Sequence, residues 1–152
     1  VQTAQAHVLG QYALAALAAG KAQDPHVKTF AQKVTADAGN ANMFIKRYAA
    51  AHNVAISNRP HVRAETQYGD IESLKGKAFD DKFVTDIGID AQLASDDYKD
   101  EADHGSDPQL KAFAKQHRSF AKAERDGRQT FALSIPDYNV CSRLPAPGAT
   151  GG

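Results

Sequence analysis

Glu101 and His104 are spaced like a pair of metal ligands on one helix. A Glu-x-x-His spacing puts a carboxylate and an imidazole on one helical face, as in the di-iron carboxylate bundles. Such a centre also needs a glutamate from each of two further helices. The whole chain has only four glutamates: Glu65, Glu72, Glu101 and Glu124. A histidine before Gly105 is also favourable simply because it complements the helix dipole. We therefore predict no metal centre, with Glu101 and His104 as the sole candidate ligands.

Other chemistry-bearing residues are few. The stretch from Asp96 to Asp107 holds six carboxylates but lacks the spaced loop ligands and central glycine of an EF-hand, so we expect adventitious calcium binding at most. Cys141 is the single cysteine, which excludes an intrachain disulfide and a multi-thiolate metal site. It falls in a segment where nothing would pre-organise a base beside it. No nucleophile elbow, phosphate loop or dinucleotide fingerprint is present, so we expect a protein without catalytic residues.

His117 and Glu124 lie on the predicted inner face of the last helix. Buried polar groups need partners, because an unsatisfied one costs about 1–3 kcal/mol. One interpretation is a residual polar pocket that binds a cofactor, with His117, Glu124, Tyr12, Tyr48 and Tyr98 as candidates. The other is a buried hydrogen-bonded pair whose partner is one of these tyrosines. We expect the second, and thus no dedicated cofactor.

The elements that position these residues are four long helices. Helix formers are dense over 2–22, and Asp24-Pro25 then ends one helix and caps the next. The second runs to about residue 52 with apolar residues at alternating spacings of three and four. Its predicted inner face consists of Val27, Phe30, Val34, Ala38, Ala41, Ile45 and Tyr48. A third, over 78–105, buries Phe79, Phe83, Ile87, Ala91, Ala94 and Tyr98. A fourth follows Asp107-Pro108 and buries Leu110, Phe113, His117, Phe120, Glu124 and Phe131.

The connections predict the topology. Residues 53–77 interrupt the pattern, with a single turn of helix expected at 71–74. Two short connections and one long crossover are typical of a ferritin-like, up-down four-helix bundle. We expect one bundle domain over 1–135 and a flexible, Pro- and Gly-rich tail over 136–152.

Composition excludes several classes of function. The 152 residues carry 18 basic and 18 acidic side chains, so nothing favours a nucleic-acid or polybasic membrane binder. The apolar run Val8–Ala19 is too short to span a bilayer, which takes about 20 residues. The chain opens on a valine, and we interpret it as a processed chain whose signal peptide has been removed.

The first helix is unusual because it holds no Asp, Glu, Lys or Arg between His7 and Gly20. A helix that is apolar all round is normally covered on more than one side. We expect self-association or a protein partner at this helix. The alternative is that residues 53–77, or the tail, cover it within the chain.

Four segments together resemble the bacterial domain-of-unknown-function 4142 family of exported ferritin-like proteins. They are Leu17–Ala22, Pro25–Ala31, Gly76–Asp80 and Asp107–Ala114, within a resemblance that spans about residues 5–134. The resemblance implies a periplasmic, extracellular or envelope-associated protein.

The same resemblance implies Asp-His pairs on helices two and three, a histidine on helix four and a glutamate on helix one. These positions read Asp37-Ala38, Asp90-Ala91, Glu124 and Gln11 here, which implies that any metal site of the family has been lost.

We therefore predict a non-catalytic, exported helical bundle that acts through protein contacts or self-association. An alternative is the binding of a small apolar ligand or cofactor between the helices. A second alternative is a metal-dependent, ferritin-like oxidoreductase.

Overall fold

A computed structural model describes the backbone of residues 1–134 and the side chains of residues 1–127. Within that part the chain forms five helices and no strand, which confirms the predicted all-α class. The helices are α1 (Gln2–Lys21), α2 (Pro25–Ala51), α3 (Val62–Glu72), α4 (Gly76–His104) and α5 (Pro108–Ser134). The tail predicted over 136–152 lies outside the described residues.

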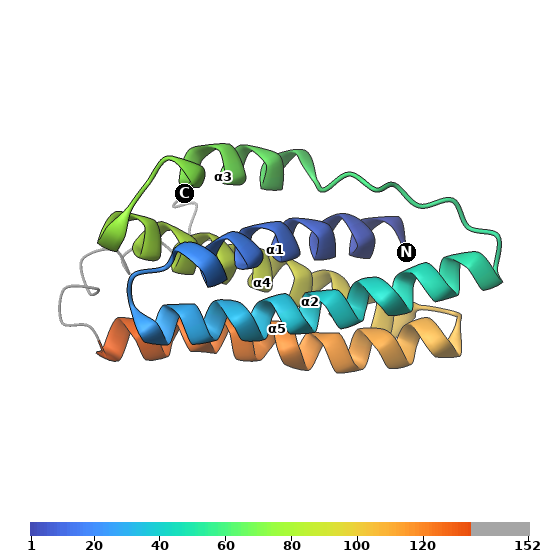
Figure 1. Ribbon diagram of the computed structural model, residues 1–152. Helices are drawn as coiled ribbons and strands as arrows, with labels where there is room; N and C mark the ends of the chain where they lie inside the picture. Colours follow the sequence, from blue (N-terminus) through green and yellow to red (C-terminus); the bar gives the residue numbers. More distant parts are fainter. Residues whose placement is uncertain (135–152) are drawn as a thin grey trace, which may run out of the picture.

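The four long helices lie side by side, and α3 lies along their outside (Figure 1). Helix α1 packs against α2 and α4, and α5 packs against the same two helices from the other side. Helix α3 contacts α1 and α4. Because the crossover returns along the length of the molecule, α2 and α4 run in the same direction (Figure 1).

The predicted start signals of two helices are confirmed. The Asp24 carboxylate accepts a hydrogen bond from the His26 backbone N–H at 2.7 Å, and Pro25 is the first residue of α2. Asp107 accepts from the N–H groups of residues 109 and 110 at the start of α5. Each carboxylate satisfies N–H groups that have no partner within the helix.

Asp80 ties the first connection to α4. Its carboxylate is 5% exposed and accepts hydrogen bonds from the backbone N–H groups of Gln23 and Asp24, at 3.1 and 2.8 Å. The neighbouring Asp81 instead pairs with Lys77 on the outside of α4 at 2.7 Å. The turn between α1 and α2 is thus held by a buried acid on a distant helix.

The prediction of a single helical turn at 71–74 is wrong, because the crossover contains the 11-residue helix α3. The side chain of His61 caps it by accepting from the Arg63 N–H at 3.2 Å. Its buried residues are Ala64, Gln67 and Ile71, which have helical spacing. With a glutamine in the middle, this stripe gives no apolar periodicity in the sequence.

The predicted inner faces of α2 and α4 are largely confirmed. All six predicted residues of α4 are buried. On α2 the buried face is shifted slightly, so that Phe30 and Tyr48 are half-buried at its edge. On α5, Phe113, His117 and Glu124 are buried, whereas Leu110 and Phe120 are half-buried; the side chain of Phe131 lies outside the described residues.

The core consists of two apolar clusters. One surrounds Phe79 and Phe83 and includes Leu14, Val34 and Ile71. The other surrounds Ile45, Tyr98 and Phe113, and includes Val8 and Ala38.

Polar residues of all four long helices occur near the level where these clusters meet: Gln11, Asp37, Asp90 and Glu124. We call these four residues the polar layer. Gln11 and Glu124 are two of the positions at which the family resemblance implied inward-facing ligands, and Asp37 and Asp90 directly precede the other two, Ala38 and Ala91.

The neutral helix α1 is covered in part from within the chain. Gly10 is buried, and a Cβ atom added there would lie 2.6 Å from the Cβ of Ala64 on α3. The two backbones therefore approach more closely than any side chain on residue 10 would allow. This contact favours the local alternative for covering α1, while Tyr12, Ala16 and Gly20 remain exposed.

Candidate ligand-binding site

The buried polar residues of α5 do not have the partners expected from the sequence. Gln11 Nε2 donates a hydrogen bond to Glu124 Oε2 at 3.3 Å, so the expectation of a tyrosine partner is wrong for Glu124. The reason is that α1 and α5 place the amide opposite the carboxyl. Burial raises the pKa of Glu124 to about 7, and the nearby Asp37 carboxylate adds to this shift.

His117 is enclosed by aromatic rings. Its ring centroid lies 4.1 Å from that of Phe113, 5.3 Å from that of Phe120 and 6.1 Å from that of Tyr98. Burial lowers the pKa of His117, while the Asp37 carboxylate raises it by less. The imidazole is therefore mainly neutral at pH 7.

His117 and Glu124 line a cavity of only about 10 Å³. That is space for about one water molecule. The two residues share this cavity with Gln11, Asp37 and Tyr98, but no organic cofactor fits there as the side chains stand.

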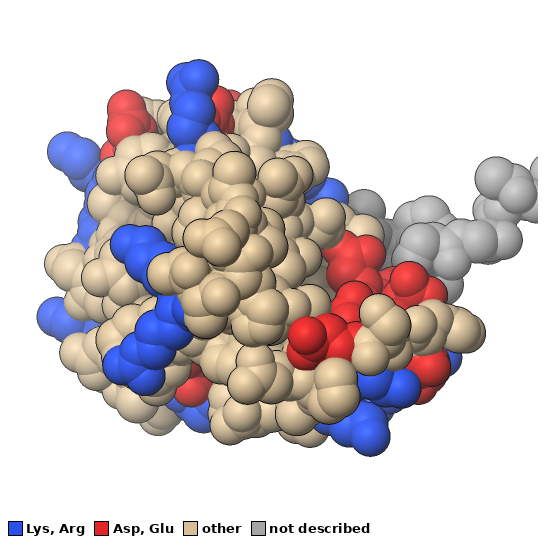
Figure 2. All heavy atoms as spheres, turned by 90° about the vertical axis from the view of Figure 1, so that its right-hand side faces the viewer, with Lys and Arg blue, Asp and Glu red and all other residues tan. Residues whose placement is uncertain are grey.

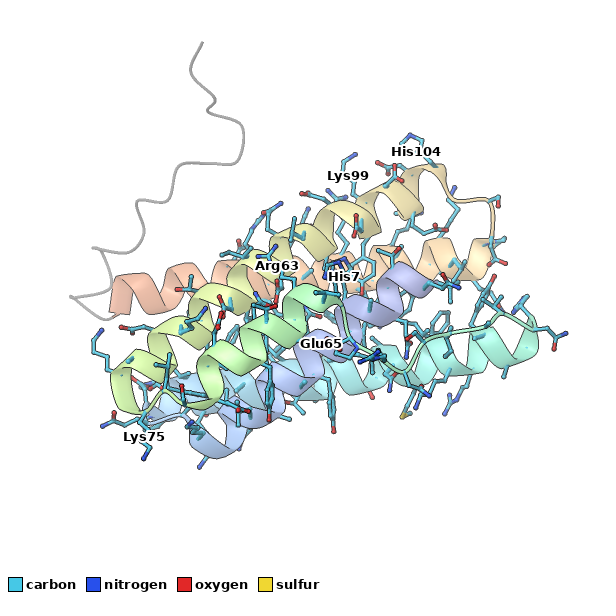
Figure 3. The ribbon with its side chains drawn as sticks, turned by 90° about the horizontal axis from the view of Figure 1, so that it is seen from above. His7, Arg63, Glu65, Lys75, Lys99 and His104 are labelled. Atoms are coloured by element: carbon cyan, nitrogen blue, oxygen red, sulfur yellow. The ribbon has the colours of Figure 1, made fainter. Side chains whose placement is uncertain are left out.

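Glu101 and His104 do not converge on one point. The His104 side chain is 76% exposed, and its Nδ1 lies 3.0 Å from Asp100 Oδ1. Seen from above, His104 and Lys99 project from the outer side of α4 (Figure 3). Among the described residues, no group of three or more His, Cys, Asp or Glu side chains is arranged to hold a metal ion.

A cavity of about 230 Å³ lies at one end of the molecule. We call it the end pocket. It lies between the first turns of α1, the last turns of α2 and α4, and the first turns of α5. Its lining residues are Val1, Thr3, Ala4, His7, Ile45, Tyr48, Asp97, Tyr98, Asp100, Glu101, Leu110, Phe113 and Ala114.

The walls of the end pocket combine aromatic rings and carboxylates. Phe113 is fixed by an edge-to-face contact with Tyr98 at 5.8 Å and by stacking on Phe44 at 4.5 Å. Three acids, Asp97, Asp100 and Glu101, come from consecutive turns of α4. Figure 2 shows acidic side chains gathered in one part of this end face, with uncharged surface beside them.

The two tyrosines of the end pocket report its electrostatics. Burial raises the pKa of Tyr98, and the charges of Glu124 and Asp97 raise it further. Burial also raises the pKa of Tyr48, with smaller contributions from its hydrogen bond to Asp107 and from Glu101. Tyr48 Oη donates to Asp107 Oδ2 at 3.0 Å, so this ring is held at the wall by the cap of α5. Both phenols therefore remain neutral in a negative environment.

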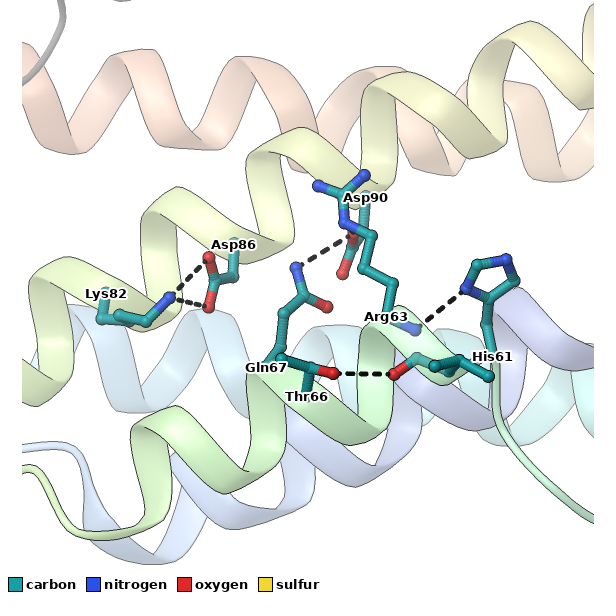
Figure 4. A network of polar contacts seen from close by, with 8 residues as sticks. His61, Arg63, Thr66, Gln67, Lys82, Asp86 and Asp90 are labelled. Carbon is teal, nitrogen blue, oxygen red and sulfur yellow. Dashed lines mark hydrogen bonds and ion pairs between the residues drawn. The ribbon is translucent and has the colours of Figure 1, made fainter.

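A second polar cluster holds α3 in place (Figure 4). Gln67 Nε2 donates to Asp90 Oδ1 at 3.3 Å, and Arg63 Nε lies 3.7 Å from the same oxygen. Burial raises the pKa of Asp90, and these two partners oppose the shift. Asp90 therefore faces the crossover, while its neighbour Ala91 is fully buried in the core.

The structure thus separates the residues predicted from the sequence. Tyr48, Tyr98 and Glu101 line the end pocket, and Tyr98 also borders the cavity of His117 and Glu124. Tyr12 belongs to neither site, because it is 46% exposed on α1.

Sequence reasoning missed His7 and Asp97, which lie 2.7 Å apart at the end pocket. They are 90 residues apart in the chain, and no local pattern connects them. The acidic stretch was the only sequence signal for this site.

These features define a protein that is all-helical over its described residues, with a half-open pocket at one end. The sequence profile of a family described as "Domain of unknown function (DUF4142)" matches residues 1–129. The chain belongs to this family, which confirms the resemblance. Neither a curated protein nor a solved structure matches the chain. In the described part, none of the helices is both long enough and apolar enough to cross a membrane.

Proposed function

We propose that this protein binds a small organic molecule in the end pocket and performs no chemistry on it. The observation that carries the proposal is the pocket itself, a space of about 230 Å³ between four helix ends. An apolar cavity of about 150 Å³ holds a benzene molecule, so the end pocket has room for a somewhat larger ligand.

The lining supports a ligand with an apolar part. Ile45 and Phe113 are nearly fully buried, and together with Leu110 they offer apolar surface. Polar groups come from more than one helix: α4 contributes its acids, and α1 contributes Thr3 and His7. Apolar surface combined with convergent polar groups is the usual composition of a small-molecule site.

Protein contact or self-association through α1 has less support. It was inferred from the neutral face of α1, and α3 covers part of that face at Gly10. The exposed large apolar residues Tyr12, Met43, Val62 and Leu93 come from four different helices. Single exposed apolar side chains are normal on a monomeric surface.

The proposal includes a ferritin-like bundle without a metal centre, located in the periplasm or cell envelope. The direction of the four long helices and the crossover support this architecture. Family membership supports the location only through the resemblance to exported proteins. The hydrogen bond between Gln11 and Glu124 supports a polar layer that is satisfied without metal.

Binding is tested by ¹H–¹⁵N NMR titration with benzyl alcohol, a neutral probe of suitable size. We expect shifts centred on Ile45, Tyr98 and Phe113. The substitution Ala4→Leu adds side-chain volume at the pocket and should weaken binding about fivefold or more. Ala112→Leu is the matched control, because residue 112 is exposed on the first turns of α5 and does not line the pocket.

The proposal is overturned if benzyl alcohol produces no saturable shifts. It is equally overturned if the shifts lie away from the end pocket, or if both leucine variants bind as the wild type does. Thermal melting of each variant verifies that the fold is retained.

A further inference from the structure

Resting on the proposed function, we propose that the ligand of the end pocket is a small organic cation with an alkylated ammonium group. Its charged head would lie at Asp97, Asp100 and Glu101 of α4. Its alkyl groups would contact the rings of Tyr48, Tyr98 and Phe113.

The charge of the lining carries the first step. Three carboxylates line the pocket, and none of its described lining residues is a lysine or arginine. The lining stays net negative even with His7 protonated and Val1 carrying a free α-amino group. Glu101 is only partly exposed, so its charge is less screened by solvent than those of Asp97 and Asp100, whose side chains are 53% and 81% exposed. An anionic ligand would therefore be repelled, and a cationic one attracted.

The three carboxylates differ in whether a basic side chain already lies beside them. Asp97 Oδ2 lies 2.7 Å from His7 Nε2, and Asp100 lies 3.0 Å from His104. The Glu101 carboxylate forms no hydrogen bond or ion pair with any described residue, although the residue is only partly exposed. Its carboxylate is therefore the group with most to gain from a cationic ligand.

The lysines of α4 do not neutralise this group. Lys99 pairs with Asp103 at 2.7 Å, and Lys82 pairs with Asp86 at 2.8 Å. Figure 3 shows Lys99 on the outer side of the helix. Lys99, the lysine nearest to Glu101 in the chain, is thus paired with Asp103.

The aromatic walls distinguish an alkylated ammonium from a metal ion or a primary amine. Cations are attracted to the faces of aromatic rings, by about 0.5–2 kcal/mol, and quaternary ammonium ligands are bound in this way. Tyr48 is the most accessible of the three rings, because Phe113 and Tyr98 are each 6% exposed and Phe113 already packs against Phe44 and His117. A divalent metal ion instead needs several oxygen ligands at one point. No such group of metal ligands occurs among residues 1–127, whose side chains are described.

Three probes of similar length test the class of ligand by NMR titration at pH 7.5. Choline carries the trimethylammonium group, and 3,3-dimethyl-1-butanol is its neutral isostere. Ethanolamine keeps the charge but lacks the methyl groups. We expect choline to bind about tenfold more tightly than either of the others, with shifts at the end pocket.

Two variants assign the preference to the pocket. Glu101→Gln removes one charge from the lining and should reduce the preference for choline over its neutral isostere about threefold or more. Asp103→Asn removes one charge from the same stretch of α4 outside the lining, and it should leave the preference unchanged. Raising the salt concentration serves as a further check, because it should weaken the binding of choline but not the binding of its neutral isostere.

The outcomes separate this inference from the proposed function. Equal affinities for choline and 3,3-dimethyl-1-butanol overturn the inference that the ligand is a cation, and they leave the proposed function intact. Tighter binding of ethanolamine than of choline overturns the role of the aromatic walls. Failure of benzyl alcohol and all three probes to bind overturns the proposed function together with the inference. An equal effect of the two variants overturns the assignment to Glu101.

Discussion

Replacing Glu124 by glutamine should stabilise the protein, and the gain should depend on pH. Glu124 is 5% exposed and has a single hydrogen bond, from Gln11. Glutamine has nearly the same shape and can still accept that hydrogen bond. The substitution therefore removes the ionisation of this residue while preserving its packing.

The size of the effect follows from the pKa of Glu124, which burial raises from 4.5 to about 7. Between these values the unfolded chain has lost the proton and the folded chain keeps it. The contribution of Glu124 to the free energy of unfolding is therefore greatest below pH 4.5. It decreases as the pH rises towards 7 and is constant above that. A shift of this size corresponds to about 3 kcal/mol in the free energy of unfolding.

Urea denaturation of both proteins at pH 4 to 9 measures this difference. Subtracting the wild-type curve from the Glu124→Gln curve cancels the titration of shared groups such as His117 and Asp90. We expect a difference near zero at pH 4 that increases by about 3 kcal/mol up to pH 8. Glu72→Gln is the control, because residue 72 is exposed and the substitution there should produce no comparable pH-dependent difference. If the difference in the free energy of unfolding between Glu124→Gln and the wild type is constant across this pH range, burial does not raise the pKa of the Glu124 carboxyl group.

Two further substitutions test the contacts that hold the crossover and the first turn. Gly10→Ala should destabilise the protein by about 1–3 kcal/mol, because the added methyl group collides with Ala64. In an Ala64→Gly background, Gly10→Ala should instead stabilise the protein by up to about 1 kcal/mol, since alanine favours the helix. Thermal melting of the wild type, the two single variants and the double variant shows whether Gly10→Ala destabilises in one background and stabilises in the other. Asp80→Ala should cost about 1–3 kcal/mol in urea denaturation, because two backbone N–H groups of the first turn lose their buried acceptor. Asp81→Ala removes the exposed ion pair with Lys77 and should cost less than about 1 kcal/mol.

The long helices could be predicted because local chemistry determines them. Asp24-Pro25 and Asp107-Pro108 are strong start signals, and both mark helix starts in the structure. Helix α3 could not be predicted in this way. Its stability comes from contacts with α1 and α4, in particular those of Gln67 and Arg63 with Asp90. A polar residue that is buried only through tertiary contact leaves no periodic signal.

The candidate site could be predicted only in part. The burial of His117 and Glu124 followed from their spacing on an amphipathic helix, and the structure confirms it. Their partner, Gln11, could not be identified, because any of several helices might have faced them. The end pocket is formed by four helix ends that are far apart in sequence. Its position depends on the relative height of the helices, which no local pattern specifies.

The pairing of the helices has a consequence for how the chain reaches this structure. Helices α1 and α2, and likewise α4 and α5, are neighbours in both sequence and space. Hairpins of this kind form from local contacts, and proteins rich in local contacts fold rapidly, in microseconds to milliseconds. What remains is the docking of two preformed halves, with α3 contacting one helix of each. The end pocket and the polar layer draw residues from both halves, so we expect both to form only at that last step.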